Sequence, residues 1–201
     1  EMGADVLEVN SIKIEDTSEK LKKYLSKLED YNHILFTSAN AVNIFFDYLI
    51  KEKYDIRRIN AKISVVGKAT KSALEARGIQ PFTMAKEFMA EGLFKAIKHH
   101  LSPDDVVLIP CSAKSKNTLK EQLEDANVLV DRVNIYDTVP GTITNIRAFD
   151  DVDIVLFTSP STVRNMIQMV GLEKIKKKKC IAIGPQTSNA LLDNGINALV
   201  C

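Results

Sequence analysis

One short phrase of this sequence occurs twice, and a second phrase follows each copy. The first phrase runs from Ile34 to Val42 as ILFTSANAV, and it returns from Ile154 to Val163 as IVLFTSPSTV. The second runs from Ile63 to Ile79 as ISVVGKATKSALEARGI, and it returns from Ile181 to Ile196 as IAIGPQTSNALLDNGI. Two phrases repeated in the same order predict two domains built on one design.

Short apolar runs alternate with helical patterns along both copies. The expected strands are 33–37, 62–66, 80–84, 105–109, 128–136, 153–157, 180–183 and 196–200. The expected helices are 16–28, 39–51, 69–77, 91–100, 116–124, 161–170 and 186–193. Nearly continuous Val, Ile, Leu and Phe in strands separated by helices is typical of α/β proteins with a parallel sheet covered on both faces.

The order of the segments predicts that one domain is inserted into the other. Residues 1–9 look like a helix end followed by a strand, as residues 124–133 do, and so they would complete the later domain. Domain 1 is then 1–10 with 144–201, domain 2 is 17–133, and 11–16 and 134–143 form two connecting strands. A double connection leaves a cleft between two lobes, which is a preferred place for a ligand. Because the first copy of the design lacks its opening strand and helix, we expect one such unit to precede residue 1.

Composition excludes several classes of function. The formal net charge of +1 gives no basic field for nucleic acid, and no apolar run approaches the roughly 18 residues of a membrane span. Cys111, Cys180 and Cys201 are far apart and predict free thiols. The sequence contains no H-E-x-x-H, no G-x-G-x-x-G and no P-loop, so we expect neither metal nor nucleotide cofactor. The sequence has no signal peptide, so we expect a cytoplasmic protein. No apolar stripe is left without an assigned place in a core, so we expect a monomer.

Small polar residues follow the strands of both copies, where parallel sheets place their ligands. Helices begin there too, and their free N–H groups attract anions. Each hydroxyl alone has the simpler explanation of a helix cap. Gly67 and Gly184 are expected to allow a tight turn or a close backbone approach. The candidate substrate-binding residues are Thr37, Ser38, Ala39, Gly67, Lys68, Thr70, Ser112, Thr158, Ser159, Ser161, Gly184 and Thr187.

The set of motifs, in order, resembles the uroporphyrinogen-III synthase family. It comprises F-T-S-x-x-x-V, V-G-x-x-T-x-x-x-L-x-x-x-G, L-I-P, Tyr136-Asp137-Thr138, F-T-S-P-S-x-V and I-G-P-x-T-x-x-A-L. The resemblance implies two flavodoxin-like lobes joined by a two-stranded connector, and a further helix after residue 201. It also implies closure of hydroxymethylbilane, a linear tetrapyrrole polycarboxylate, to uroporphyrinogen III with inversion of the last ring, without metal or cofactor. Contact with the preceding enzyme of the pathway is left open.

Tyr136 matches the tyrosine of the family's Y-x-T motif and is the candidate acid for the leaving hydroxyl. The alternative is a tyrosine packed at a hinge with its hydroxyl satisfied. The family commonly has Arg-Gly after L-I-P, whereas this chain has Cys111-Ser112, with Lys114 and Lys116 near enough to substitute.

The sequence leaves two questions open. The lysine run at 174–179 either draws an anionic substrate or is solvated surface. The competing class of function is a non-catalytic two-lobed protein that binds a small carboxylate.

Overall fold

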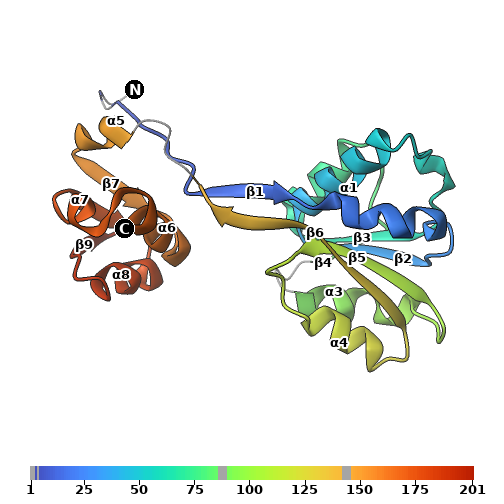
Figure 1. Cartoon of the computed structure of the whole chain (residues 1–201). Helices are drawn as coiled ribbons and strands as arrows, with labels where there is room; N and C mark the ends of the chain where they lie inside the picture. Colours follow the sequence, from blue (N-terminus) through green and yellow to red (C-terminus); the bar gives the residue numbers. More distant parts are fainter. Residues whose placement is uncertain (1–2, 4, 86–89, 142–145) are drawn as a thin grey trace. The chain divides into compact units, whose positions relative to one another are not determined.

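The computed structural model of this chain describes residues 3, 5–85, 90–141 and 146–201 (Figure 1). The chain divides into two compact units. Unit 1 consists of Glu1–Ile14 with Val139–Cys201, and unit 2 consists of Glu15–Thr138. Each unit has a β-sheet and helices of its own.

A six-stranded sheet forms the centre of unit 2, in the order β1-β6-β5-β2-β3-β4. The strands are β1 (Ile12–Asp16), β2 (His33–Phe36), β3 (Lys62–Val66), β4 (Thr83–Ala85), β5 (Val106–Ser112) and β6 (Leu129–Pro140). The helices are η1 (Ser18–Lys27), α1 (Ala39–Lys51), η2 (Ile56–Arg58), α2 (Gly67–Glu75), α3 (Ala90–Ile97), η3 (Lys98–His100) and α4 (Thr118–Glu124). The pairs from β6 to β4 are parallel.

Both faces of this sheet are covered, because successive side chains of a strand point to opposite faces. Phe36 of β2 packs edge-on against Phe45 of α1, with 5.4 Å between ring centroids. Its neighbour Leu35 belongs instead to the buried cluster that Leu93 of α3 and Leu119 of α4 help to form. Figure 1 shows α1 on one face of the sheet and α3 with α4 on the other.

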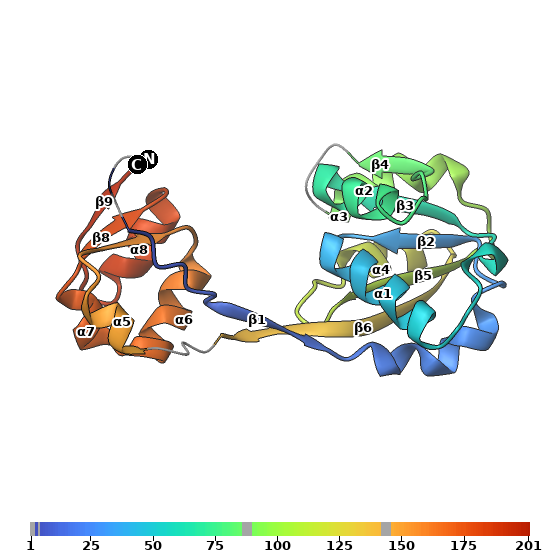
Figure 2. The same ribbon diagram turned by 90° about the horizontal axis from the view of Figure 1, so that it is seen from above.

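β1 runs antiparallel to β6 and makes the sheet a mixed one (Figure 2). The Thr17 N–H donates to the Ile135 carbonyl at 2.9 Å, and the Gly141 N–H donates to the Ser11 carbonyl at 3.0 Å. At Gly141 the two segments are so close that an added Cβ would lie 2.0 Å from the Asn10 carbonyl oxygen. Only glycine fits there without a shift of the backbone.

Unit 1 contains a smaller, parallel sheet in the order β7-β8-β9. Its strands are β7 (Ile154–Phe157), β8 (Lys179–Ala182) and β9 (Ala198–Val200), and its helices are α5 (Ile146–Asp150), α6 (Pro160–Val170), α7 (Leu172–Lys176) and α8 (Pro185–Leu192). Val155 and Phe157 enter one buried cluster with residues of these helices. Ile154 and Leu156, which alternate with them, are 50% and 60% exposed. The expectation of a sheet covered on both faces is therefore wrong for β7, because one helical layer packs on one side only.

Most of the expected elements form, and the differences have physical reasons. Residues 6–9 form no strand; Val6 is 87% exposed, and a strand needs a neighbour to pair with. The expected helix 16–28 is the 3₁₀ helix η1, whose repeat of three residues aligns Ser18, Leu21 and Tyr24. The expected strand 80–84 begins later, at Thr83, and the strand expected at 128–136 runs on to Pro140.

Candidate functional site

The carboxyl ends of four neighbouring parallel strands bring one group of the predicted residues to the same edge of unit 2. β2 lies between β3 and β5, and β6 lies beside β5. Thr37, Ser38 and Ala39 follow β2, Gly67, Lys68 and Thr70 follow β3, Ser112 ends β5, and Tyr136 lies in β6. This edge is the candidate functional site of unit 2.

The Ser38 and Tyr136 hydroxyls are 2.9 Å apart, and either oxygen can be the donor. Ser38 is also the N-cap of α1, where its Oγ accepts from the Ala41 N–H at 3.1 Å. Tyr136 is 6% exposed. A residue expected from one motif thus lies against a residue expected from another, although 98 positions separate them in sequence. The helix cap and the packed tyrosine both exist here, and together they hold a phenol at the start of a helix.

A β-bulge aims Tyr136 at this edge. Cys111 pairs with Asn134, but Ser112 pairs with Tyr136, so that Ile135 is an extra residue in β6. The Ala113 N–H donates to the Tyr136 carbonyl at 2.8 Å and closes the turn after β5. Bulges change the direction of a side chain in this way and are frequent next to functional sites.

The other predicted residues of unit 2 have distinct surroundings. Gly67 has a φ of +75°, a conformation that favours glycine, and it begins α2. Thr70 is 3% exposed and Ser112 is 8% exposed, whereas Lys68 is exposed to solvent. The Ser112 Oγ accepts from the Lys114 N–H at 3.2 Å, which fixes the turn rather than leaving the hydroxyl free.

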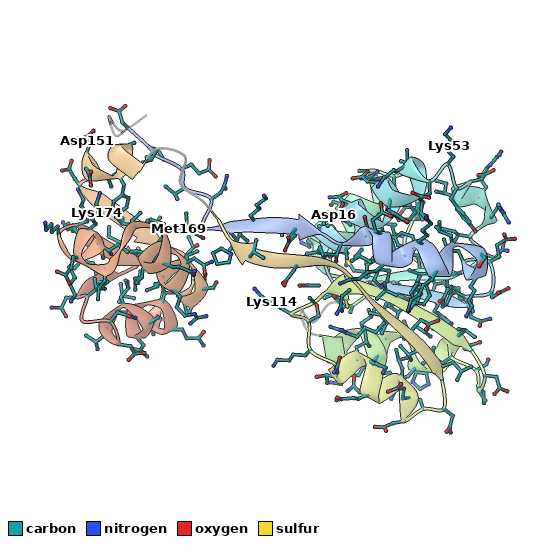
Figure 3. The ribbon with its side chains drawn as sticks, viewed as in Figure 1. Asp16, Lys53, Lys114, Asp151, Met169 and Lys174 are labelled. Carbon is teal, nitrogen blue, oxygen red and sulfur yellow. The ribbon has the colours of Figure 1, made fainter. Side chains whose placement is uncertain are left out.

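Lys114, labelled in Figure 3, is bound to β6. Its Nζ donates to the Thr138 carbonyl and lies 3.8 Å from the Asp137 carboxylate. Lys116 is exposed. Of the two lysines expected to replace an arginine after L-I-P, Lys114 therefore has partners already.

Unit 1 brings together the corresponding residues of the second copy. β7 and β8 are parallel neighbours, with Phe157 opposite Ala182, so Thr158, Ser159, Ser161, Gly184 and Thr187 follow them at one edge. Ser159 caps α6 in a capping box with Thr162, and its Oγ lies 2.9 Å from that of Ser161. Thr187 is 3% exposed, whereas Thr158 and Ser161 are exposed.

Gly184 does not need the conformational freedom of glycine for a tight turn, and its close approach to a ligand stays a prediction. Its φ of −174° is extended backbone that any residue adopts, and an added Cβ would meet nothing within 4 Å. Pro185 begins α8 and sets the start of that helix by its own restricted φ. The two copies of the glycine therefore differ, since only Gly67 has a positive φ.

Arg132 was not predicted. Its guanidinium donates to the carbonyl oxygens of Ser112 and Ser115 at 3.2 and 2.7 Å, and to the Asn134 Oδ1 at 2.6 Å. One feature of the sequence could have indicated it. Arg132 and Asn134 are polar residues on alternate positions of an apolar strand that leads to Tyr136. Burial raises the pKa of the nearby Cys111 thiol, and the positive charge of Arg132 opposes that shift.

The lysine run of unit 1 is mostly engaged with its own surroundings. Lys174 Nζ lies 2.7 Å from the Asp150 carboxylate, and Lys178 Nζ donates to the Asp150 carbonyl at 2.6 Å. All three cysteines are free. Within the described ranges, no helix is both long and apolar enough to cross a membrane, and no three metal-binding side chains gather.

Similar proteins agree on one fold and one family. The chain is 28% identical over 198 residues to a porphyrin biosynthesis protein HemD of Ruminiclostridium josui, covering 94% of this chain and 39% of that one. It is 29% identical over 197 residues to a putative uroporphyrinogen-III synthase of Methanothermobacter thermautotrophicus, covering 90% of this chain and 77% of the other. A mutant uroporphyrinogen III synthase of Thermus thermophilus matches in structure with a TM-score of 0.58 and 16% identity, over 94% of this chain and 80% of that one.

The fold places the chain among two-sheet α/β proteins, with a mixed six-stranded sheet and a parallel three-stranded one. A family model described as "Uroporphyrinogen-III synthase HemD" matches residues 1–201. The chain therefore belongs to the uroporphyrinogen-III synthase family, the hydro-lyases of tetrapyrrole biosynthesis. The resemblance expected from the repeated motifs is confirmed. The chain spans 39% of the length of the Ruminiclostridium relative.

Proposed function

We propose that this chain closes hydroxymethylbilane to uroporphyrinogen III, with inversion of the last pyrrole ring and loss of water. Family membership supports the reaction. The hydrogen bond between Ser38 and Tyr136 is the observation that supports a reaction site at this edge of unit 2. This bond places an O–H group at the carboxyl edge of a parallel sheet, beside the N-terminus of α1.

Tyr136 supplies the proton in this proposal. Its phenol donates to the hydroxyl that leaves the linear tetrapyrrole, water departs, and the electrophilic end is attacked by the last ring. The attack comes from the carbon of that ring that already carries the methylene bridge, which gives a spiro intermediate. The bond from this carbon to its old bridge then breaks, the released bridge carbon bonds to the ring's unsubstituted α-carbon, and that carbon loses the proton that returns to the phenolate. Ser38 acts as a positioning residue, because the Ala41 N–H bound to its Oγ limits the directions in which that oxygen can meet Tyr136.

Helix N-termini hold the substrate's carboxylates. α1 and α2 begin at the edge of unit 2, and α6 and α8 begin at the edge of unit 1. Backbone N–H groups and helix dipoles favour anions and need no protonation. The uncatalysed chain also closes, but without inversion, so the enzyme's task is mainly to hold the reacting ends in the correct arrangement.

The domain organisation belongs to the same proposal. We propose two flavodoxin-like domains, 1–10 with 144–201 and 17–133, connected by 11–16 and 134–143. The division of contacts at Ile14 and Val139 supports these bounds. We also propose that the protein acts as a monomer, without metal or cofactor. Contact with the preceding enzyme of the pathway is left open.

An isomer assay tests the activity. The full natural chain is incubated with freshly prepared hydroxymethylbilane, and the products are oxidised and separated as type I and type III isomers. An excess of type III over the protein-free control supports the synthase. Formation of the type I isomer alone would contradict the synthase activity. It would favour the competing class of function, a two-lobed protein that binds a small carboxylate.

A further inference from the structure

A basic pocket lies in unit 2, lined by residues other than the predicted site residues. It has a volume of about 550 Å³. Its lining comes from η1 and from the middle of β6, and includes Lys20, Lys22, Lys23, Arg132 and Asn134. None of these five residues was among the predicted site residues.

Arg132 lies half-buried in this pocket with neutral partners. Its three hydrogen bonds go to two carbonyl oxygens and one side-chain amide oxygen. An arginine has five N–H donors, so two remain beyond these bonds. No carboxylate forms an ion pair with Arg132 in the part of the chain that the structure describes. A partly buried charge without a counter-ion is costly, and an anion in the pocket would remove that cost.

The three lysines add to the same charge. Lys20, Lys22 and Lys23 form no ion pair with any described residue, and Lys23 lies over the ring of Tyr24 at 4.9 Å. The carboxylate that lines this pocket, Glu19, is paired elsewhere, with Lys51 of α1. Hydrogen bonding from Lys51 is the main cause that lowers the pKa of Glu19, and the charge of Lys22 adds a smaller contribution.

A second cavity of unit 2 shows that a basic lining alone is not unusual. It has about the same volume, 540 Å³, and is lined by residues that include Arg57, Arg77 and Lys62. There Arg57 is paired with Asp55 at 2.6 Å and Arg77 with Asp47 at 2.6 Å. Its two guanidinium groups are neutralised by the protein, whereas that of Arg132 is not.

We propose that the basic pocket binds a carboxylate of the tetrapyrrole, with Arg132 as its main contact and Lys20, Lys22 and Lys23 around it. The identity of the ligand rests on the proposed function; the preference for a carboxylate anion rests on the pocket. Arg132 precedes Tyr136 by four residues on β6, roughly 13 Å along a strand. A long, flexible polycarboxylate can therefore reach both residues, and the pocket would select substrates by an acidic group remote from the reacting ring.

The test uses two probes that do not react. Uroporphyrin I, a stable porphyrin polycarboxylate, is titrated into the full chain and followed by its fluorescence. Trimesate, a benzene ring bearing carboxylates on alternate carbons, is titrated while backbone amide shifts are recorded. We expect shifts centred on residues 19–24 and 132–134, weakened by salt, and none with the neutral triol of the same ring.

Matched variants identify the contacts. Arg132→Gln should weaken uroporphyrin binding about tenfold, as expected when a charge-assisted hydrogen bond is lost. The double variant K20Q/K23Q should weaken it about threefold; both side chains are exposed and form no ion pair with a described residue, and the contact of Lys23 with the Tyr24 ring is the one that is lost. Lys27→Gln, on the same helix but outside the pocket lining, is the control and should bind as the wild type does.

The outcomes separate this inference from the proposed function. Amide shifts elsewhere, or equal affinity in K20Q/K23Q, Lys27→Gln and the wild type, would overturn the pocket. If the wild type makes type III product but shows no binding here, the pocket fails and the synthase stands. If the probes bind here but no type III product forms, the carboxylate site stands and the synthase fails.

Discussion

The repeated phrase L-F-T-S lies in two different surroundings in this chain. In β2 all four strand residues are buried, and Leu35 is 0% exposed. In β7 the exposed and buried residues alternate, and the corresponding Leu156 is 60% exposed. The serine that follows differs as well, because Ser38 contacts a buried tyrosine of β6 whereas Ser159 contacts its near neighbour Ser161.

The comparison teaches that a repeated sequence preserves the strand, the turn and the helix cap but not what surrounds them. Both serines cap their helices through the third residue on. Among the described residues, unit 2 has helices on both faces of its sheet and a tyrosine from a distant strand beside its serine, and unit 1 has neither. Chemistry beyond capping is therefore expected at the first copy, and four experiments test that difference between the two units.

The largest difference in stability is expected at the two leucines. Leu35→Ala removes a fully buried side chain and should lower the free energy of unfolding of unit 2 by about 2–5 kcal/mol. Leu156→Ala removes a mostly exposed one and should cost no more than about 0.5 kcal/mol. Native-state hydrogen exchange reads the two units separately, as a single melting temperature does not. Equal losses would contradict the difference in burial.

Removal of one oxygen tests the tyrosine. Tyr136→Phe should lower the rate of type III formation by about 10²-fold, because the proton donor is lost while the ring remains. Tyr54→Phe, the same change at a hydroxyl without a hydrogen-bond partner among the described residues, should leave that rate within about twofold, since Tyr54 is not among the predicted site residues. Single-turnover kinetics with isomer analysis measures both. Full turnover by the phenylalanine variant would assign Tyr136 to packing alone.

The two capping serines should differ by a smaller amount. Ser159→Ala loses a helix cap, at about 1 kcal/mol. Ser38→Ala loses a cap and also leaves the buried Tyr136 hydroxyl without its partner, which adds about 1 kcal/mol or more. Urea unfolding of each variant against the wild type gives the two values. In the Ser38→Ala, Tyr136→Phe double variant, the costs should be less than additive, because the two residues share one bond.

The smallest effect concerns pH and the residue that begins β2. His33 is buried, and burial lowers its pKa, although Asp105 at 3.5 Å acts in the opposite direction. Below a pH of about 6.5 the unfolded chain therefore binds the extra proton more readily, and unit 2 loses stability as the pH falls through that value. Ile154 holds the corresponding place in β7 and cannot titrate. Urea midpoints across this range should flatten in His33→Leu, and should follow the wild type in the exposed control His99→Gln.

Much of the architecture could be predicted from the sequence, because the strands and helices depend on local patterns. Apolar runs gave β2, β3, β5, β7 and β8, and the serines marked the starts of α1 and α6. Burial of β7 could not be predicted, since it depends on which other segments reach that face. The strand expected at residues 6–9 was wrong for the same reason, as pairing requires a neighbour that the segment itself does not encode.

The candidate site was predictable only in part. The strand-end rule predicted Ser38 and the resemblance to the family predicted Tyr136, and their contact follows from the parallel order of β2, β5 and β6. Arg132 was not predicted because a charge in a strand is usually solvated. Its acceptors lie on β6, at the end of β5 and in the turn that follows, and the path of that turn cannot be predicted from a pattern. Of the two matching glycines Gly67 has a positive φ and Gly184 does not, because glycines that look alike in sequence can have different φ angles.

The extra residue in β6 makes the length of that strand as important as its composition. Deleting one position between Leu129 and Tyr136 would change the parity of every side chain beyond the deletion. The phenol would then turn toward the side that Ile135 occupies, and the Asp137 carboxylate would take the place that faces Ser38. Some natural variants or engineered chimaeras will preserve every side chain named here but have one residue more or fewer in this interval. These proteins should fold poorly, and their tyrosine should no longer face Ser38.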